Sequence, residues 1–309
     1  MKRLAGVIVA LAVTAGIVAA WGFAAPTKGV GPNYATGASA KKPKFPALPP
    51  QVKERHRWVI GVKCDFPPFG FIDVQGNNNG YDVQVARRFA TLAFGRPNRI
   101  SLVCVTTPSR IPTLMSSRVD VIISTLTWTS ARAQVINFSV PYYSATGRLL
   151  VPNNSSINSV HDLAGKTIVT TRGALYATWV RNCFKSSKLL EVDGTAAAVL
   201  AVKEGRADTF MFDDAFVLGV ATQDPSLKLT GDRFLNVPWG IGIRKDDTAT
   251  TRWVNAAIRF MQSKDEFATI LKANAPKRYW GSFLTNVPRP GTKFAYPVGK
   301  DPTADCSGA

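Results

Sequence analysis

The amino-acid sequence predicts an α/β protein in which parallel strands carry helices on both faces of a sheet. From Trp58 onward, runs of β-branched residues alternate with stretches whose apolar residues recur at helical spacing. The 309 residues are enough for two domains, each with a core of its own. Apolar residues make up 46% and charged residues 19%, which is typical of a globular protein.

The first half of the chain alternates strictly between the two kinds of element. Residues 58–64 are a β-branched run typical of a buried strand, and residues 71–81 contain a Gly-Asn-rich turn typical of a small hairpin. Asp82 is a candidate N-cap for the helix that follows. The next predicted elements are a strand at 100–105, a helix at 109–117 and a strand at 119–124. This β-α-β-α-β order predicts a parallel sheet.

The second half continues the alternation. The predicted elements are a strand at 166–171, a helix at 173–184, a helix at 196–204, a strand at 209–213, a strand at 239–244 and a helix at 251–261. Doubly wound sheets bind ligands at the carboxyl ends of their strands. A ligand site is therefore expected among residues 63–66, 125–129, 171–175 and 212–214.

The N-terminus has the features of an export signal. Lys2 and Arg3 precede an uncharged, mostly apolar run at 4–27. Residues 1–24 are predicted to be either a signal peptide, cleaved before Ala25, or an N-terminal membrane anchor, because the run is also long enough to span a bilayer. Both alternatives place the rest of the chain outside the cytoplasm. Residues 25–57 are rich in Pro, Gly, Ala and Lys and are expected to form a flexible basic tether.

The formal charge of +18 is unevenly distributed along the chain. Nine cations and one acid precede residue 58, so the remaining residues carry a net charge of +10. A basic body suits nucleic acid, an anionic membrane surface or an anionic ligand. The chain has no basic stripe interleaved with aromatic residues and no helix-turn-helix or zinc-finger pattern, so we expect no nucleic-acid partner.

Four cysteines fit an oxidising compartment, and four allow three pairings. They lack the close paired spacings of a metal site, so we expect no metal. We favour a Cys64–Cys104 pair, because both residues lie at the ends of predicted strands. We favour a Cys183–Cys306 pair, which would fix the C-terminal tail to the second half of the chain.

Five sequence blocks, in order, resemble the family-3 extracellular solute-binding proteins, the polar amino-acid receptors of ABC importers. The blocks span residues 58 to about 285 and read GVKCDFPPFGF-x9-YDVQVARRFA, RIPTLMSSRVDVIISTLTWTSARAQVINFSVPYYSA, LAGKTIVTTRGALYATWV, EGRADTFMFDDA and WGIGIRKDD. The resemblance implies a type II periplasmic-binding-protein fold, with two doubly wound lobes joined by a two-strand hinge. It implies a first lobe at 58–149 and 240–285, a second lobe at 150–239, and a tail at 286–309 outside the resemblance.

The resemblance also implies residues that bind the α-carbon groups of an amino acid. Arg132, in TWTSAR, matches the arginine that binds the α-carboxylate, and its guanidinium can bond both oxygens at once. Asp213, in FMFDDA, matches the acid that accepts the α-ammonium, with the adjacent Asp214 as the alternative. Thr125 and Thr127 stand where the family offers backbone and hydroxyl groups to the same part of the ligand.

Two further regions are expected to contact the ligand. Thr171 and Leu175 flank the start of a predicted helix after Gly173, and a helix N-terminus favours a carboxylate through its free N–H groups. Phe66 matches the aromatic residue that packs over the aliphatic part of the ligand in the family.

The side-chain pocket is expected to contain Lys63, Thr107 and Arg110. Many relatives carry an acid at the position of Lys63, whereas cationic and hydroxylic residues resemble the glutamate/aspartate receptors of the family. Two cations that converge on one cavity repel unless an anion lies between them. We therefore favour glutamate or aspartate as ligand, with asparagine or glutamine as the alternative.

The predicted function is hinge closure on a free amino acid, which the protein then delivers to the membrane subunits of an ABC-type importer. We expect a monomer with no cofactor and no enzymatic activity. One rival is a periplasmic dehydratase of the cyclohexadienyl type on the same fold, which would need a general acid or base in the cleft. The two histidines, His56 and His161, lie at no predicted strand end. A second rival is a ligand-sensing module held by an uncleaved leader.

Overall fold

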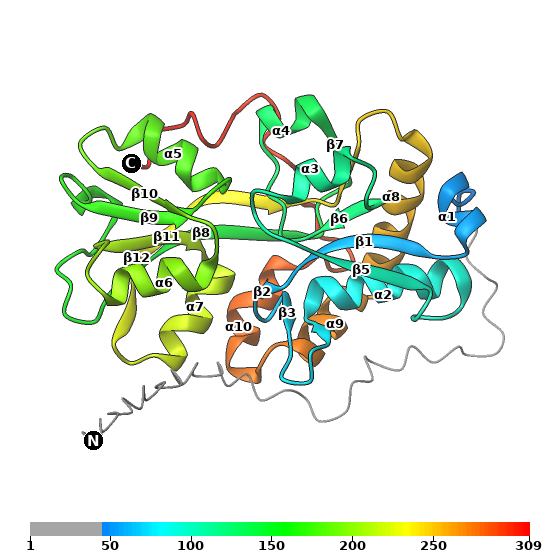
Figure 1. Ribbon diagram of the computed structural model, residues 1–309, viewed down its shortest axis with the longest axis horizontal. Coiled ribbons are helices and arrows are strands. Elements are labelled where there is room, and N and C mark those ends of the chain that lie inside the picture. The colour runs from blue at the N-terminus through cyan, green and yellow to red at the C-terminus, as the bar shows by residue number, and fades with distance from the viewer. Residues whose placement is uncertain (1–44) are drawn as a thin grey trace, which may run out of the picture.

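The computed structural model describes residues 45–309, and the predicted leader and residues 25–44 of the predicted tether lie outside the described residues. Two lobes lie side by side, each with a central sheet and covering helices (Figure 1). Within residues 45–309, no helix has the length and apolar character needed to cross a membrane.

The first lobe is built on a five-stranded sheet. Its strands, in spatial order, are β5 (Ile100–Val105), β1 (Trp58–Lys63), β6 (Val121–Ile123), β13 (Gly242–Arg244) and β7 (Ile136–Phe138). β1 is parallel to both β5 and β6, whereas β13 is antiparallel to β6 and β7. Its helices are α2 (Tyr81–Phe94), α3 (Arg110–Met115), α4 (Ser130–Val135), α8 (Thr248–Ser263) and α9 (Glu266–Asn274). α3 and α4 lie on one side of the sheet, and α2 and α9 on the other (Figure 1).

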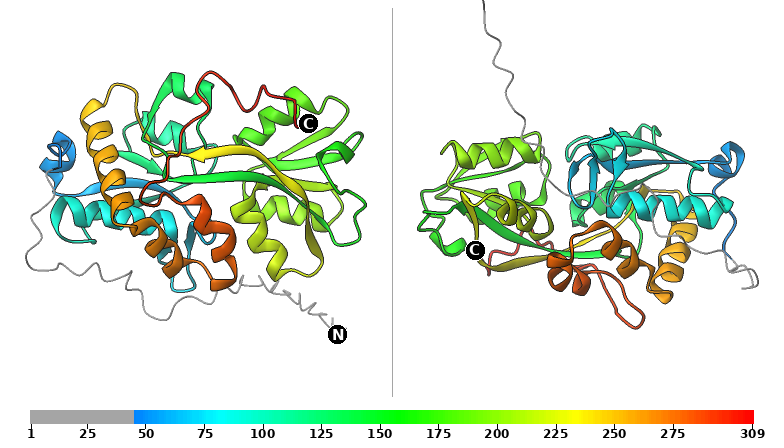
Figure 2. Two further views of the ribbon diagram at one scale, coloured as in Figure 1. Left: turned by 180° about the vertical axis from the view of Figure 1, so that it is seen from behind. Right: turned by 90° about the horizontal axis from the view of Figure 1, so that it is seen from below.

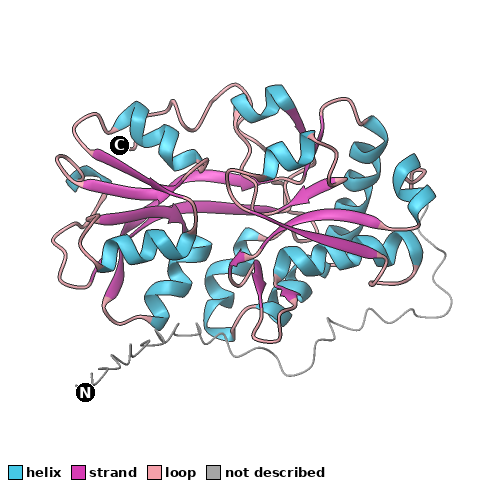
Figure 3. Cartoon of the chain, viewed as in Figure 1, coloured by secondary structure: helices cyan, strands magenta, loops and turns pink. Residues whose placement is uncertain are grey.

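The second lobe repeats this arrangement. Its strands, in spatial order, are β10 (Lys188–Val192), β9 (Thr167–Thr171), β11 (Thr209–Asp213), β8 (Tyr143–Pro152) and β12 (Leu227–Trp239). β9 is parallel to β10 and β11, and β8 is antiparallel to β11 and β12. Helix α5 (Leu175–Cys183) covers one face of this sheet, and α6 (Thr195–Lys203) and α7 (Asp214–Gln223) cover the other (Figure 3).

Short elements complete the structure. A three-stranded sheet is formed by β2 (Asp65–Phe66), β3 (Gly70–Ile72) and β4 (Asn78–Asn79), where the sequence predicts a hairpin. The other short elements are α1 (Pro50–Arg55), η1 (Val160–Asp162), η2 (Lys277–Tyr279), α10 (Trp280–Phe283) and η3 (Leu284–Asn286).

Two long strands join the lobes. β8 and β12 pair antiparallel over nearly their whole length and run from one lobe into the other (Figures 1 and 2). The register of the pair shifts between Thr230 and Asn236, and Leu235 has a left-handed φ of 51°. The type II periplasmic-binding fold, with two doubly wound lobes and a two-strand hinge, is therefore confirmed. The exact lobe boundaries given above stay a prediction.

The parallel arrangement predicted for the strands at 58–64, 100–105 and 119–124 is confirmed, and antiparallel strands complete each sheet. Two expectations about local structure are wrong. The predicted strand at 239–244 is the end of β12 followed by a separate β13. Asp82 is not the N-cap of α2, because that position belongs to Gly80 and Asp82 lies inside the first turn.

The predicted flexible tether is also wrong for residues 45–57. Helix α1 begins with a proline in its first turn, and its Val52 is fully buried. The ring of Phe45 lies 5.8 Å from that of Trp253 and 5.6 Å from that of Phe260. A single buried side chain in a six-residue helix gives no sequence periodicity, so tertiary packing orders a segment whose composition resembles a linker.

Two disulfides are present in the structure, Cys64–Cys104 and Cys183–Cys306. These are the two pairs that the sequence analysis favours. The first joins β5 to the residue after β1 within the first lobe. The second joins the end of α5, in the second lobe, to the C-terminal tail. The first disulfide therefore fixes the carboxyl ends of two parallel strands, and the second fixes the end of the chain to the second lobe.

Candidate functional site

A cavity of about 240 Å³, counting its open mouth, lies between the two lobes. Its lining residues share one feature, since each lies at or just beyond the carboxyl end of a parallel strand. They are Thr107, Arg110, Thr125 and Thr127 from the first lobe and Ala174, Leu175, Tyr176, Phe212 and Asp213 from the second. The cavity therefore lies where a doubly wound sheet is expected to bind a ligand.

Six of the ten predicted ligand-binding residues line this cavity, namely Thr107, Arg110, Thr125, Thr127, Leu175 and Asp213. The other four predicted residues, Lys63, Phe66, Arg132 and Thr171, surround it without lining it. Of these, Thr171 carries a buried hydroxyl that has no hydrogen-bond partner within residues 45–309.

Arg132 bridges the two lobes. It lies in the first turn of α4, where its N–H donates to the side chain of the N-cap Thr129. Its Nη1 donates to the carbonyl of Thr127 at 2.6 Å, and its Nη2 donates to the carbonyl of Gly173 in the second lobe at 2.8 Å. Burial, reinforced by the charge of Arg110, lowers the pKa of Arg132 to about 9. The guanidinium is still cationic at neutral pH and keeps further N–H donors for an anion.

Arg110 places a second cation at the cavity. It is 4% exposed, and its Nη1 donates to the carbonyls of Ser124 and Thr125 at 2.9 and 3.1 Å. Burial lowers the pKa of Arg110 to about 10, and the negative charge of Asp213 opposes that shift. Arg110 therefore holds the turn after β6 in place while it contributes positive charge to the cavity.

Asp213 supplies the negative charge on the opposite wall. It ends β11, is 5% exposed, and accepts a hydrogen bond from the hydroxyl of Tyr176 at 2.8 Å. Burial raises the pKa of Asp213 to about 7, and the nearby Asp214 raises it further. Asp214 itself accepts the N–H of Thr146 and lies 3.4 Å from Arg233, outside the cavity lining. Of the two adjacent acids, Asp213 is thus the one that lines the cavity.

A buried carboxylate positions the backbone at Thr125. This residue has a left-handed φ of 49°, which is uncommon for a β-branched residue. Its N–H donates to Asp82 Oδ2 at 2.9 Å, and the hydroxyl of Tyr142 donates to Asp82 Oδ1 at 3.1 Å. Burial raises the pKa of Asp82 to about 7. The strained backbone at Thr125 is therefore stabilised by the side chain of Asp82, which belongs to α2.

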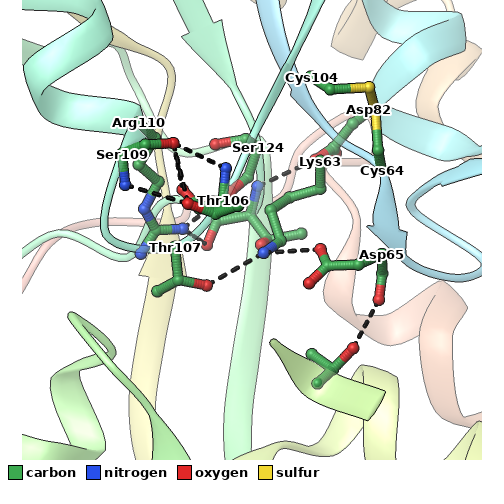
Figure 4. A network of polar contacts seen from close by, with 12 residues as sticks. Lys63, Cys64, Asp65, Asp82, Cys104, Thr106, Thr107, Ser109, Arg110 and Ser124 are labelled. Atoms are coloured by element: carbon green, nitrogen blue, oxygen red, sulfur yellow. Dashed lines mark hydrogen bonds and ion pairs between the residues drawn. A yellow bond between two sulfur atoms is a disulfide. The ribbon is translucent and has the colours of Figure 1, made fainter. Parts of the chain in front are cut away.

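Lys63 does not face the cavity as an unpaired cation. Its Nζ lies 2.8 Å from Oδ1 of Asp65 and donates to the hydroxyl of Thr107 at 3.0 Å (Figure 4). Burial lowers the pKa of Lys63, and the carboxylate of Asp65 opposes that shift. Since Thr107 lines the cavity, the pair contributes a charge-balanced group at its edge, with both a donor and an acceptor.

Phe66 packs across the interface between the lobes. It is fully buried, and its ring lies 5.7 Å from that of Phe212 and 5.2 Å from that of Phe216, both in the second lobe. Thr195 of the second lobe also donates to the carbonyl of Asp65 at 2.7 Å. Together with the Arg132–Gly173 hydrogen bond, these contacts show that the lobes are closed on one another in this structure.

Four residues at or beside the cavity escaped the sequence analysis, namely Asp65, Ala174, Tyr176 and Phe212. All four adjoin predicted residues along the chain, so the sequence indicates the segments but not these members of them. Asp65 lies between Cys64 and Phe66, and nothing local indicates that its carboxylate turns toward Lys63.

Opposite charges therefore face one small cavity from two lobes, with hydroxyl groups between them. Such an arrangement suits a small zwitterion, because each buried charge then finds a partner. Neither histidine lines the cavity, since His56 caps the end of α1 and His161 lies in the exposed η1.

Comparisons with known proteins agree with this geometry. The family model described as bacterial extracellular solute-binding proteins, family 3, matches residues 58–275. The glutamine-binding protein of Geobacillus stearothermophilus is 36% identical over 198 residues, which cover 63% of this chain and 76% of that protein. The ABC transporter glutamine-binding protein GlnH of Bacillus subtilis (strain 168) is 30% identical over 244 residues, covering 78% and 89%. Among solved structures, a solute receptor for L-cysteine of Neisseria gonorrhoeae superposes with a TM-score of 0.72 at 25% identity, covering 75% and 95%.

Proposed function

This chain belongs to the bacterial extracellular solute-binding proteins of family 3, and from that premise we propose that its cleft binds a polar α-amino acid for delivery to an ABC-type importer. The observation that carries the proposal is the pair of opposite charges, Arg132 and Asp213, one from each lobe. Each charge influences the pKa of the other, so the two lie within electrostatic reach. An α-carboxylate and an α-ammonium on one carbon would satisfy both.

Ligand binding would act by hinge closure. Arg132 belongs to the first lobe and Asp213 to the second, so a zwitterion held by both stabilises the closed arrangement over an open one. An importer can then distinguish loaded from empty protein by the relative position of the lobes. Each of the two hinge strands crosses between the lobes, so the lobes can move relative to one another without disrupting the core of either lobe.

For the side chain of the ligand, we propose a carboxamide, as in glutamine or asparagine. Lys63 and Arg110 need an anion near them to offset their repulsion, and Asp65 supplies that anion from the protein itself, so an acidic ligand is not required. A charge-balanced Lys63–Asp65 pair offers a donor for the amide oxygen and an acceptor for the amide N–H₂ group. The names of the two glutamine-binding relatives support the same class.

Glutamate or aspartate stays the second candidate. Its support is that Arg110 lines the cavity as a buried cation, with Lys63 and Arg132 close behind it. An acidic side chain would need one of these cations free of a protein counter-charge. The choice between the two classes therefore depends on Asp65.

A thermal-shift screen of the twenty amino acids, followed by calorimetry, tests the proposal, because a ligand that binds the folded state raises Tm. We expect shifts from glutamine or asparagine, and weaker ones from glutamate and aspartate. The Asp65→Asn variant leaves Lys63 without its counter-charge, so its preference should move toward glutamate. Tighter binding of glutamate than of glutamine by the unmodified protein would contradict the carboxamide assignment. Binding of none of the twenty amino acids would contradict the receptor proposal.

A further inference from the structure

The C-terminal segment of the chain begins on the first lobe and ends on the second. The chain leaves the first lobe after Val287, which is fully buried there, and ends beside α5 of the second lobe (Figures 1 and 2). We call residues 287–309 the C-terminal strap. It lies outside the region matched by the family, which stops at residue 275.

The strap is first held on the first lobe. Arg289 pairs with Asp265, with its Nη2 2.6 Å from Oδ2 of the acid. Farther along, the hydroxyl of Tyr296 donates to the carbonyl of Ser139 at 2.6 Å. The ring of Tyr296 also stacks on Trp128, with 5.7 Å between the centroids. An ion pair, a hydrogen bond and an aromatic stack therefore fix the first half of the strap.

The strap is then held on the second lobe, this time covalently. Cys306 forms the disulfide with Cys183 at the end of α5. Asn182 donates to the carbonyl of Thr303 at 2.7 Å, and the indole of Trp179 donates to a strap carbonyl at 2.9 Å. Thr303 is also buried. The far end of the strap cannot leave the second lobe while the disulfide is intact.

Only a short segment crosses between these two sets of contacts. Tyr296 is fixed to the first lobe and Pro302 is buried against the second, so residues 297–301 make the crossing. Five residues span at most about 18 Å when fully extended. Tyr296, where the crossing begins, stacks on Trp128, the neighbour of the cavity-lining Thr127. Asp301, near the end of the crossing, lies within electrostatic reach of Arg132. The crossing therefore runs beside the cleft.

We propose that the C-terminal strap is a third, covalently closed connection between the lobes, which limits how far the cleft opens. The hinge strands alone leave the lobes free to separate, as in other hinge-closing proteins. With the strap in place, separation must extend a five-residue segment or break its contacts on the first lobe. The ligand-free protein therefore opens less far than it would without the strap.

The strap also affects ligand binding, and this part rests on the proposed function. A protein whose open state is restricted populates its binding-competent arrangement more, so its apparent affinity rises and its ligand leaves more slowly. The effect on the shape of the ligand-free protein, in contrast, does not depend on which ligand binds.

Small-angle X-ray scattering of the ligand-free full chain tests the proposal, and two variants release the strap differently. Cys183→Ser with Cys306→Ser removes the covalent end. An insertion of about ten Gly and Ser residues between Gly299 and Lys300 keeps the disulfide but adds a flexible coil to the crossing. We expect both variants to show a larger radius of gyration than the unmodified protein.

The matched control is Cys64→Ser with Cys104→Ser, which removes the disulfide that lies within the first lobe. It should leave the ligand-free radius of gyration unchanged. An unchanged radius in the insertion variant would overturn the proposal. A larger radius of gyration in both double Cys→Ser variants, but not in the insertion variant, would also overturn it, because that pattern indicates loosened lobes rather than a longer strap. Absence of ligand binding in every protein, with the expected radii, would count against the proposed function alone.

Discussion

The pH dependence of ligand binding follows from the environment of Asp213. Burial raises its pKa to about 7, with Asp214 raising it further, while the Tyr176 hydroxyl and the cations Arg110 and Arg132 oppose the shift. Only the ionised carboxylate can form an ion pair with an α-ammonium. Binding should therefore weaken as the pH falls through 7, because an increasing share of the protein must lose a proton before it binds.

The size of the effect follows from the same pKa. Two pH units below a pKa of about 7, roughly 1% of the carboxylate is ionised, so affinity at pH 5 should be about 100-fold below its plateau above pH 8. This corresponds to about 2.7 kcal/mol. Affinity falls rather than rises as the pH falls, because the ligand binds the deprotonated form of Asp213, and binding below pH 7 therefore releases a proton. Calorimetry at several pH values, in buffers of different ionisation enthalpy, measures both the affinity and the proton release.

Two variants separate Asp213 from other groups that titrate in the same range. Asp213→Asn should bind weakly and lose the dependence on pH. Asp82 also has a pKa of about 7, but its carboxylate faces Thr125 and Tyr142 rather than the cavity. Asp82→Asn should therefore keep the dependence. A constant dissociation constant between pH 8 and pH 5, or a slope that persists in Asp213→Asn, would refute this reasoning.

Three further changes have outcomes that the structure predicts. Arg132→Ala should weaken binding at least tenfold by calorimetry, because a charge-assisted hydrogen bond contributes about 1.5–3 kcal/mol. Gly173→Ala should lower affinity by calorimetry, because the added Cβ would lie 3.2 Å from Pro108 across the cleft, and it should also lower Tm, because the φ of 74° disfavours a side chain; unchanged affinity would contradict the closed contact. Cys64→Ser with Cys104→Ser should destabilise the first lobe by up to about 4 kcal/mol, estimated for a 40-residue loop, and urea denaturation would measure it.

Much of the fold could be predicted from local sequence. β1, β5 and β9 are short runs rich in β-branched residues, β11 is a short apolar run, and a parallel α/β arrangement follows from their alternation with helices. Cavity-lining residues then lie at or beyond the strand ends. β8 and β12 gave no comparable signal, because each passes from one lobe into the other and changes its neighbours along its length. Helix α1 was missed because one buried side chain fixes it.

The sequence by itself indicated the segments at the cleft and six of the residues that line it, since position after a strand is a local property. It determined Arg132 and Asp213 as candidates for the two α-carbon groups, and the structure brings both to one cleft. Only the tertiary structure decided the charge balance of the site. Asp65 forms an ion pair with Lys63, and the hydroxyl of Tyr176 donates to Asp213. Both contacts depend on where the side chains point in the folded protein, which the sequence pattern does not indicate. Charges interact through space, so their effect depends on distances that exist only after the chain has folded.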